Sequence, residues 1–158
     1  MKLSNKKKIK ELYEDCERKH KFIEDIRKHA NKHLGKAKND LRIAKKEFEN
    51  NGRDWAIIKA DYSIFHAGNY LLLKNKGFFC KNHPCLLIAL KHHKLISGEF
   101  YKKLVKIHKR LSDFGFDLTF QLKELGQYDF YEWKRITKED VKLGIRTAER
   151  FIQFAENA

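Results

Sequence analysis

Four histidine and arginine side chains are candidates for metal-free chemistry on a phosphodiester: His66, His83, His108 and Arg110. An imidazole can move a proton near neutral pH, and a guanidinium can stabilise the negative charge of a phosphorane. Together such groups could cleave RNA without a metal. A lone histidine in an apolar helix is more often a hydrogen-bonded core residue, so each of the four is a catalytic candidate with a structural alternative.

A second set of residues could bind an anion or a nucleotide. Lys81 and His83 precede Pro84, which suits the first turn of a helix, and the backbone N–H groups at a helix start attract anions. Tyr62 and Asn69 lie four residues before and three after His66, and this spacing puts all three near one helix face. The alternatives are that His83 caps the helix and that the Tyr–His–Asn cluster fixes the packing.

The three cysteines, Cys16, Cys80 and Cys85, are odd in number, which weakens any disulfide framework. The segment "CKNHPC" (80–85) resembles half of a metal site, but a structural zinc ion usually has four ligands and no second cysteine pair exists. We therefore expect three ordinary thiols, no metal and no cofactor.

The charge of the chain is strongly positive, with a formal net charge of +14. Residues 1–46 hold sixteen Lys/Arg against seven Asp/Glu, and the remainder holds nineteen against fourteen. A basic surface attracts polyanions such as nucleic acids, although it can also serve only to keep a protein in solution. Glycine-rich phosphate loops, His-Glu-x-x-His metal motifs and Gly-x-Ser-x-Gly elbows do not occur in the sequence.

The length of 158 residues suits one domain. No window of 18 residues is apolar enough to span a membrane, and the charged start "MKLSNKKKIKELYEDC" lacks the apolar core of a signal peptide. We expect a cytoplasmic protein without membrane contact.

The elements that must position the candidate residues are helical throughout. Apolar residues recur at steps of three and four over residues 5–49, which predicts one long kinked helix or two helices, with a gap at His20 and a break at Gly35. "NNG" at 50–52 predicts a turn. The next helix, from Trp55 to its end at Gly77, is apolar on most sides, as expected of the centre of a bundle.

Further along the chain, Ser97 is predicted to cap a helix, and "TKED" (137–140) is predicted to form a capping box before the last helix. Residues 115–125 either extend the preceding helix or kink it, and the aromatic-rich segment 128–133 is predicted to be a connector. No strand is predicted. The fold class is all-α, an antiparallel helical bundle of five or six helices.

The stretch "ADYSIFHAGNYLLLKNKGFFCKNHP" (60–84) resembles the HEPN family, in its Phe-His-Ala helix, its Lys-Gly loop and its Lys-x-His segment. The C-terminal "YDFYEWKRITKEDVKLGIRTAERFIQFAEN" is similar to the last part of the same family. The resemblance covers residues 36–157. It divides the chain into a basic N-terminal helical extension (1–35) and a HEPN-like helical domain (36–158).

The resemblance implies an up-and-down bundle that forms a homodimer, often encoded beside a minimal nucleotidyltransferase, and many relatives are RNase toxins. Their catalytic motif is an arginine followed four to six residues later by a histidine. Here no histidine follows Arg110, and Leu125 stands near the position of another common arginine. The aromatic residues of 128–133 could form an exposed apolar patch at the dimer interface.

These observations predict a non-catalytic or weakly catalytic protein that binds nucleotide or RNA, or a nucleotidyltransferase partner, in a toxin–antitoxin-like or defence setting. One alternative is a metal-independent HEPN endoribonuclease toxin that uses the displaced histidines. The other is a structural helical adaptor.

Overall fold

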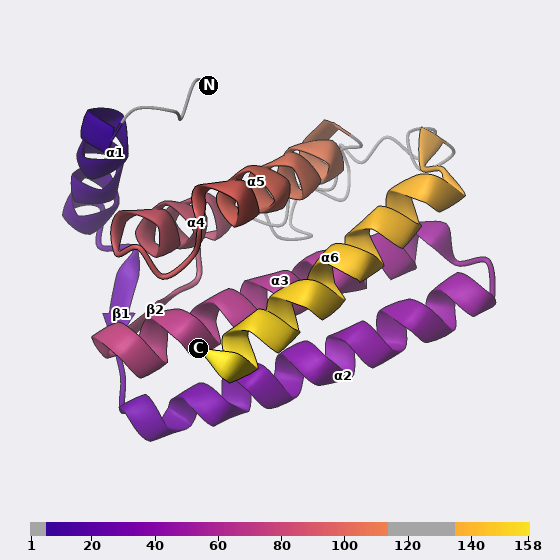
Figure 1. Ribbon diagram of the computed structural model, residues 1–158, viewed down its shortest axis with the longest axis horizontal. Helices are drawn as coiled ribbons and strands as arrows, with labels where there is room; N and C mark the ends of the chain where they lie inside the picture. The colour runs from indigo at the N-terminus through magenta and orange to yellow at the C-terminus, as the bar shows by residue number, and fades with distance from the viewer. Residues whose placement is uncertain (1–5, 114–134) are drawn as a thin grey trace.

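The computed structural model describes residues 6–113 and 135–158, and this part of the chain is an all-α bundle, as predicted (Figure 1). Its α-helices are α1 (Lys6–Arg18), α2 (Ala30–Glu49), α3 (Arg53–Lys76), α4 (His83–His92), α5 (Gly98–Asp113) and α6 (Lys138–Asn157). Two short strands, β1 (Phe22–Glu24) and β2 (Phe78–Cys80), and a 3-10 turn, η1 (Arg27–His29), complete it.

Helix α3 is the centre of the bundle, as its all-round apolar pattern predicts. Helices α2 and α6 pack along it on one side, while α4 and α5 lie on its other side (Figure 1). Two alanines of α2 and two of α3 are completely buried: Ala37, Ala44, Ala56 and Ala60. Small side chains let two helix backbones approach closely, so a long antiparallel pair forms around the turn at 50–52.

Local signals in the sequence locate several helix ends correctly. Gly77 ends α3 in the left-handed conformation with φ of 80°, which glycine adopts without steric cost. The Ser97 hydroxyl accepts a hydrogen bond from the Phe100 amide. The capping box of α6 is confirmed, because Thr137 accepts from the amide of Asp140 and the Asp140 carboxylate accepts from the amide of Thr137.

The N-terminal region differs from the prediction. Helices α1 and α2 are separate, and the break lies at residues 19–29, whereas Gly35 lies inside α2 facing open space. Within the break, β1 pairs antiparallel with β2, with Phe22 opposite Cys80. The prediction of no strand was therefore wrong. Each strand has only three residues, which is too short to give an alternating pattern, and the pairing depends on a partner almost sixty residues away.

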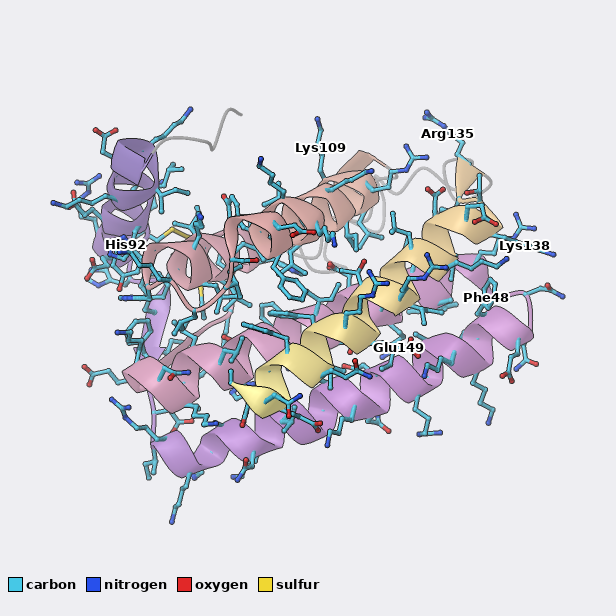
Figure 2. The ribbon with its side chains drawn as sticks, in the orientation of Figure 1. Phe48, His92, Lys109, Arg135, Lys138 and Glu149 are labelled. Carbon is cyan, nitrogen blue, oxygen red and sulfur yellow. A yellow bond between two sulfur atoms is a disulfide. The ribbon has the colours of Figure 1, made fainter. Side chains whose placement is uncertain are left out.

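The expectation of three ordinary thiols was also wrong. Cys16 of α1 and Cys85 of α4 form a disulfide, with Cα atoms 5.9 Å apart, seen as the yellow bond between these helices in Figure 2. Cys80 is the free cysteine; it is buried and donates to the carbonyl of Asn82. Ile9, Tyr13 and Cys16 form the buried face of α1. The bond thus joins the N-terminal helix covalently to the bundle.

Two predictions, the end of the helix at 115–125 and the aromatic connector at 128–133, fall outside the described residues. None of the described helices combines the length and the apolar character needed to cross a bilayer.

Breaking the disulfide is expected to destabilise the protein, because the bond joins residues 69 positions apart and so restricts the unfolded chain strongly. Cys16→Ser should lower the free energy of unfolding by about 2–4 kcal/mol. Urea unfolding of the oxidised proteins, followed by circular dichroism, measures this. A reductant should lower the midpoint of the wild type to that of the variant and leave the variant unchanged. Equal midpoints for the oxidised wild type and the variant would contradict the expectation.

Candidate functional site

Two of the candidate histidines meet a carboxylate that the sequence analysis did not single out. Asp61 of α3 and His83, the first residue of α4, are both buried, and His83 Nδ1 lies 3.4 Å from Asp61 Oδ2. The ring of half-buried His108 on α5 stacks at an angle of 32° on that of His83, with centroids 4.4 Å apart. Three helices therefore bring one carboxylate and two imidazoles together in the interior of the bundle.

The Asp61–His83 pair has the spacing of an ion pair, but its surroundings favour neutral forms. Burial raises the pKa of Asp61 to about 8. Burial, followed by the neighbouring His108 and His66, lowers the pKa of His83 to about 3. Removing a charge from water costs more than one imperfect contact at 3.4 Å can return. At neutral pH we therefore describe the pair as a protonated carboxyl group beside a neutral imidazole.

His66 lies in a second polar cluster, between α3 and α2. Its Nε2 is 3.8 Å from Oδ2 of Asp40, a fully buried carboxylate. Lys36 Nζ lies 2.6 Å from Asp40 Oδ1, and Lys59 Nζ lies 3.8 Å from the same oxygen. Burial lowers the pKa of His66 to about 4 despite the opposing effect of Asp40. The two lysines therefore compensate the Asp40 charge, and His66 contributes a neutral ring.

The structure does not gather the remaining candidates around the histidines. Asn69 is fully occupied, because its amide donates to the carbonyl of Cys80 and accepts from the amide of the same residue, each at 2.9 Å. Tyr62 is half-buried beside Lys59, and Lys81 is exposed at the loop before α4. Arg110 binds the Asp140 carboxylate at the start of α6, with Nε 3.1 Å from Oδ1.

A surface groove lies elsewhere, between the C-terminal half of α2 and α6, where Figure 2 labels Phe48 and Glu149. Its walls are Lys45, Phe48, Glu49, Lys142, Ile145, Arg146 and Glu149, and Lys45 pairs with Glu149 across it. None of the candidate site residues lines this groove.

The sequence contained a signal for both of the carboxylates that were missed. Asp40 lies on the same helix face as Ala37 and Ala44, and Asp61 lies on that of Ile57 and Ile64. A carboxylate on an apolar stripe must be buried, and a buried carboxylate needs a partner. Spacing alone could not identify the partner of Asp61, because His83 and His108 reach it from other helices.

The architecture and the buried polar clusters define a small all-α bundle protein with titratable groups inside its central helix pairs. A model of the HEPN domain family matches residues 30–158, from the first residue of α2 onward, so the chain belongs to the HEPN family. No curated protein matches the chain.

The raised pKa of Asp61 predicts a specific pH dependence of stability. A carboxyl group whose pKa is raised on folding makes its full contribution to the stability of the folded state at pH values below its unfolded pKa, near 3.8. That contribution is lost as the pH rises toward the folded pKa of about 8. Asp61→Asn cannot ionise, so it should be more stable than the wild type at pH 8, by about 2 kcal/mol or more, and similar to it at pH 4. Urea unfolding at both pH values measures the difference.

A matched control is Glu99→Gln, which removes one carboxylate with a side chain 81% exposed. It should change stability little at either pH, since exposed pairs contribute little. A wild type that is no less stable than Asp61→Asn at pH 8 would show that Asp61 is ionised and well compensated.

Proposed function

We propose that this HEPN protein is non-catalytic or weakly catalytic and binds nucleotide or RNA through the exposed face of α5. The main support for this proposal is the positive charge of that face, because residues 102–110 hold five Lys/Arg and no Asp/Glu. Lys102, Lys106 and Lys109 are exposed and follow one another at four and three residues, which sets them in one row along the helix. Lys109 points away from the bundle in Figure 2.

The row differs from the other basic residues on α5 in its partners. Lys103 pairs with Glu99, and Arg110 pairs with Asp140. Lys102, Lys106 and Lys109 make no ion pair with any described residue. At 1.5 Å of rise per residue these charges follow one another at about 6 Å and about 4.5 Å along the helix axis. Closely spaced cations without partners raise the local potential, and lysines that neutralise phosphates release the cations condensed on the nucleic acid, which favours binding.

The placement of the histidines supports binding more than cleavage. A general acid or base must reach the substrate directly or through one water. His83 is only 3% exposed, and His66 is a neutral ring directed toward Asp40. The alternative of a metal-independent endoribonuclease rests on His108, which is half-buried on α5, between Lys106 and Lys109 in the sequence. The third possibility, a structural adaptor, requires no phosphate contact at all.

Neutralising the row should weaken RNA binding and its salt dependence. The triple variant Lys102→Gln, Lys106→Gln and Lys109→Gln should lower the affinity for single-stranded RNA at least about 10-fold, and it should reduce the slope of log K against log salt by about 2. Fluorescence anisotropy of labelled RNA at several KCl concentrations measures both.

The control replaces three lysines that already have carboxylate partners: Lys10→Gln, Lys19→Gln and Lys142→Gln. It changes the net charge equally and should alter binding much less. Equal binding by the wild type and the α5 variant would contradict the proposed face, and wild-type binding without salt dependence would favour the adaptor. Gel electrophoresis of the RNA after the same reactions tests the alternative function, because cleaved RNA would support the endoribonuclease.

Membership of the HEPN family supports two further proposals. The protein forms a homodimer, and it acts with a nucleotidyltransferase partner in a toxin–antitoxin-like or defence setting. Sedimentation velocity of the full chain should give the mass of a dimer at micromolar concentration, and a monomer would contradict that proposal. Co-purification with a nucleotidyltransferase encoded beside the gene would support the partner, and its absence from the purified complex would count against it.

A further inference from the structure

Three side chains with metal-binding atoms converge from three helices. Asp61, His83 and His108 each offer one ligand atom, and these three atoms all lie within 4.8 Å of one another. We propose that this triad binds one divalent transition-metal ion of the zinc type, which joins α3, α4 and α5. The inference departs from the sequence-based expectation of no metal. It does not depend on the nucleic-acid binding proposed above, because the triad and the lysine row share no residue.

The distances within the triad suit metal coordination better than a hydrogen bond. A hydrogen bond between nitrogen and oxygen spans at most about 3.2 Å, whereas His83 Nδ1 and Asp61 Oδ2 are 3.4 Å apart. Two ligand atoms held at zinc–ligand distances in a tetrahedron are about 3.4 Å apart. His108 is half-buried at the edge of the triad, and its ligand nitrogen lies within 4.8 Å of both of the other ligand atoms.

Asp61 provides independent support, because its carboxyl group is buried without a hydrogen-bond partner among the described residues. The residue is 1% exposed, and among the described residues neither carboxyl oxygen has a hydrogen-bond partner. Buried polar atoms in native proteins almost always have a partner, and leaving one without it is costly. A cation between Asp61 and the two imidazoles would supply the missing partner. Asp40, the other buried carboxylate of the described residues, already has one in Lys36.

The ligand types indicate which ions fit. Two imidazoles and one carboxylate are the donors that zinc, cobalt, nickel and iron bind, whereas magnesium and calcium prefer oxygen ligands throughout. Three ligands leave one tetrahedral position for water or for another ligand, as in zinc sites that are not closed by protein. His108 is the most exposed of the three, so this position is nearest to solvent on the α5 side.

Titration of the metal-free full chain, with its disulfide intact, tests the site. Isothermal titration with ZnCl₂ should give one ion per chain, and Zn²⁺ should raise the melting temperature. Asp61→Asn and His108→Gln should each weaken binding by more than about 10-fold, the smallest loss usual even for a residue that only supports a ligand. His29→Gln is the matched control, since His29 Nδ1 and Asp25 Oδ1 form a half-buried His–Asp pair 3.0 Å apart that lies outside the triad.

The outcomes separate the triad from adventitious binding. The proposal would be overturned if His108→Gln bound Zn²⁺ as tightly as the wild type, or if only His29→Gln lost Zn²⁺ affinity. It would also be overturned if the wild type showed no saturable Zn²⁺ binding. Circular dichroism checks that each variant is folded. Co²⁺ bound to the wild type gives a readout that needs no variant: intense visible absorption supports a tetrahedral site, and the weak absorption of the octahedral aqueous ion contradicts it. RNA binding can fail in its own assay without affecting either result.

Discussion

The burial of α3 is the constraint on which the rest of the structure depends. A helix packed against four others buries most of its middle, so a polar side chain on a buried face of it needs a partner on a neighbouring element. Ser63 donates to the carbonyl of Ala37 on α2, and Asn69 forms both of its hydrogen bonds with Cys80 of β2. Asp61 contacts His83 of α4. These contacts fix how α2, β2 and α4 are placed around the central helix, which non-directional apolar packing alone does not determine.

The features of the fold that follow from local interactions were predictable. A capping box needs only Thr137 and Asp140, and the end of α3 needs only a glycine that accepts a positive φ at residue 77. The pairing of β1 with β2 and the Cys16–Cys85 bond are different, because each joins segments that a long helical pair separates. Periodicity reports which face of a helix is buried, but it does not report which distant segment covers that face.

The same distinction applies to the site. His66 and His83 stood out because each is an unusual residue in its local sequence, and the structure places both in polar clusters. Their neighbours could not be inferred, since Asp40 reaches His66 from α2 and His108 reaches His83 from α5. Asn69 shows a different role: this polar residue beside a candidate histidine holds strand β2 in place through its two hydrogen bonds with Cys80. The sequence therefore indicated which side chains could take part in a polar cluster, but only the packed structure showed which residues contact one another.

The disulfide has a consequence for the covalent topology of the molecule. The chain from Cys16 to Cys85 forms a closed ring that includes all of α2 and α3. A protease that cuts the exposed turn at 50–51 would open the ring without dividing the protein, because the two fragments would still be connected through sulfur. Only reduction would then remove the covalent link between the two fragments, and a nicked, reduced molecule would be held together only by noncovalent contacts, among them the packing of α1 and α2 against the bundle.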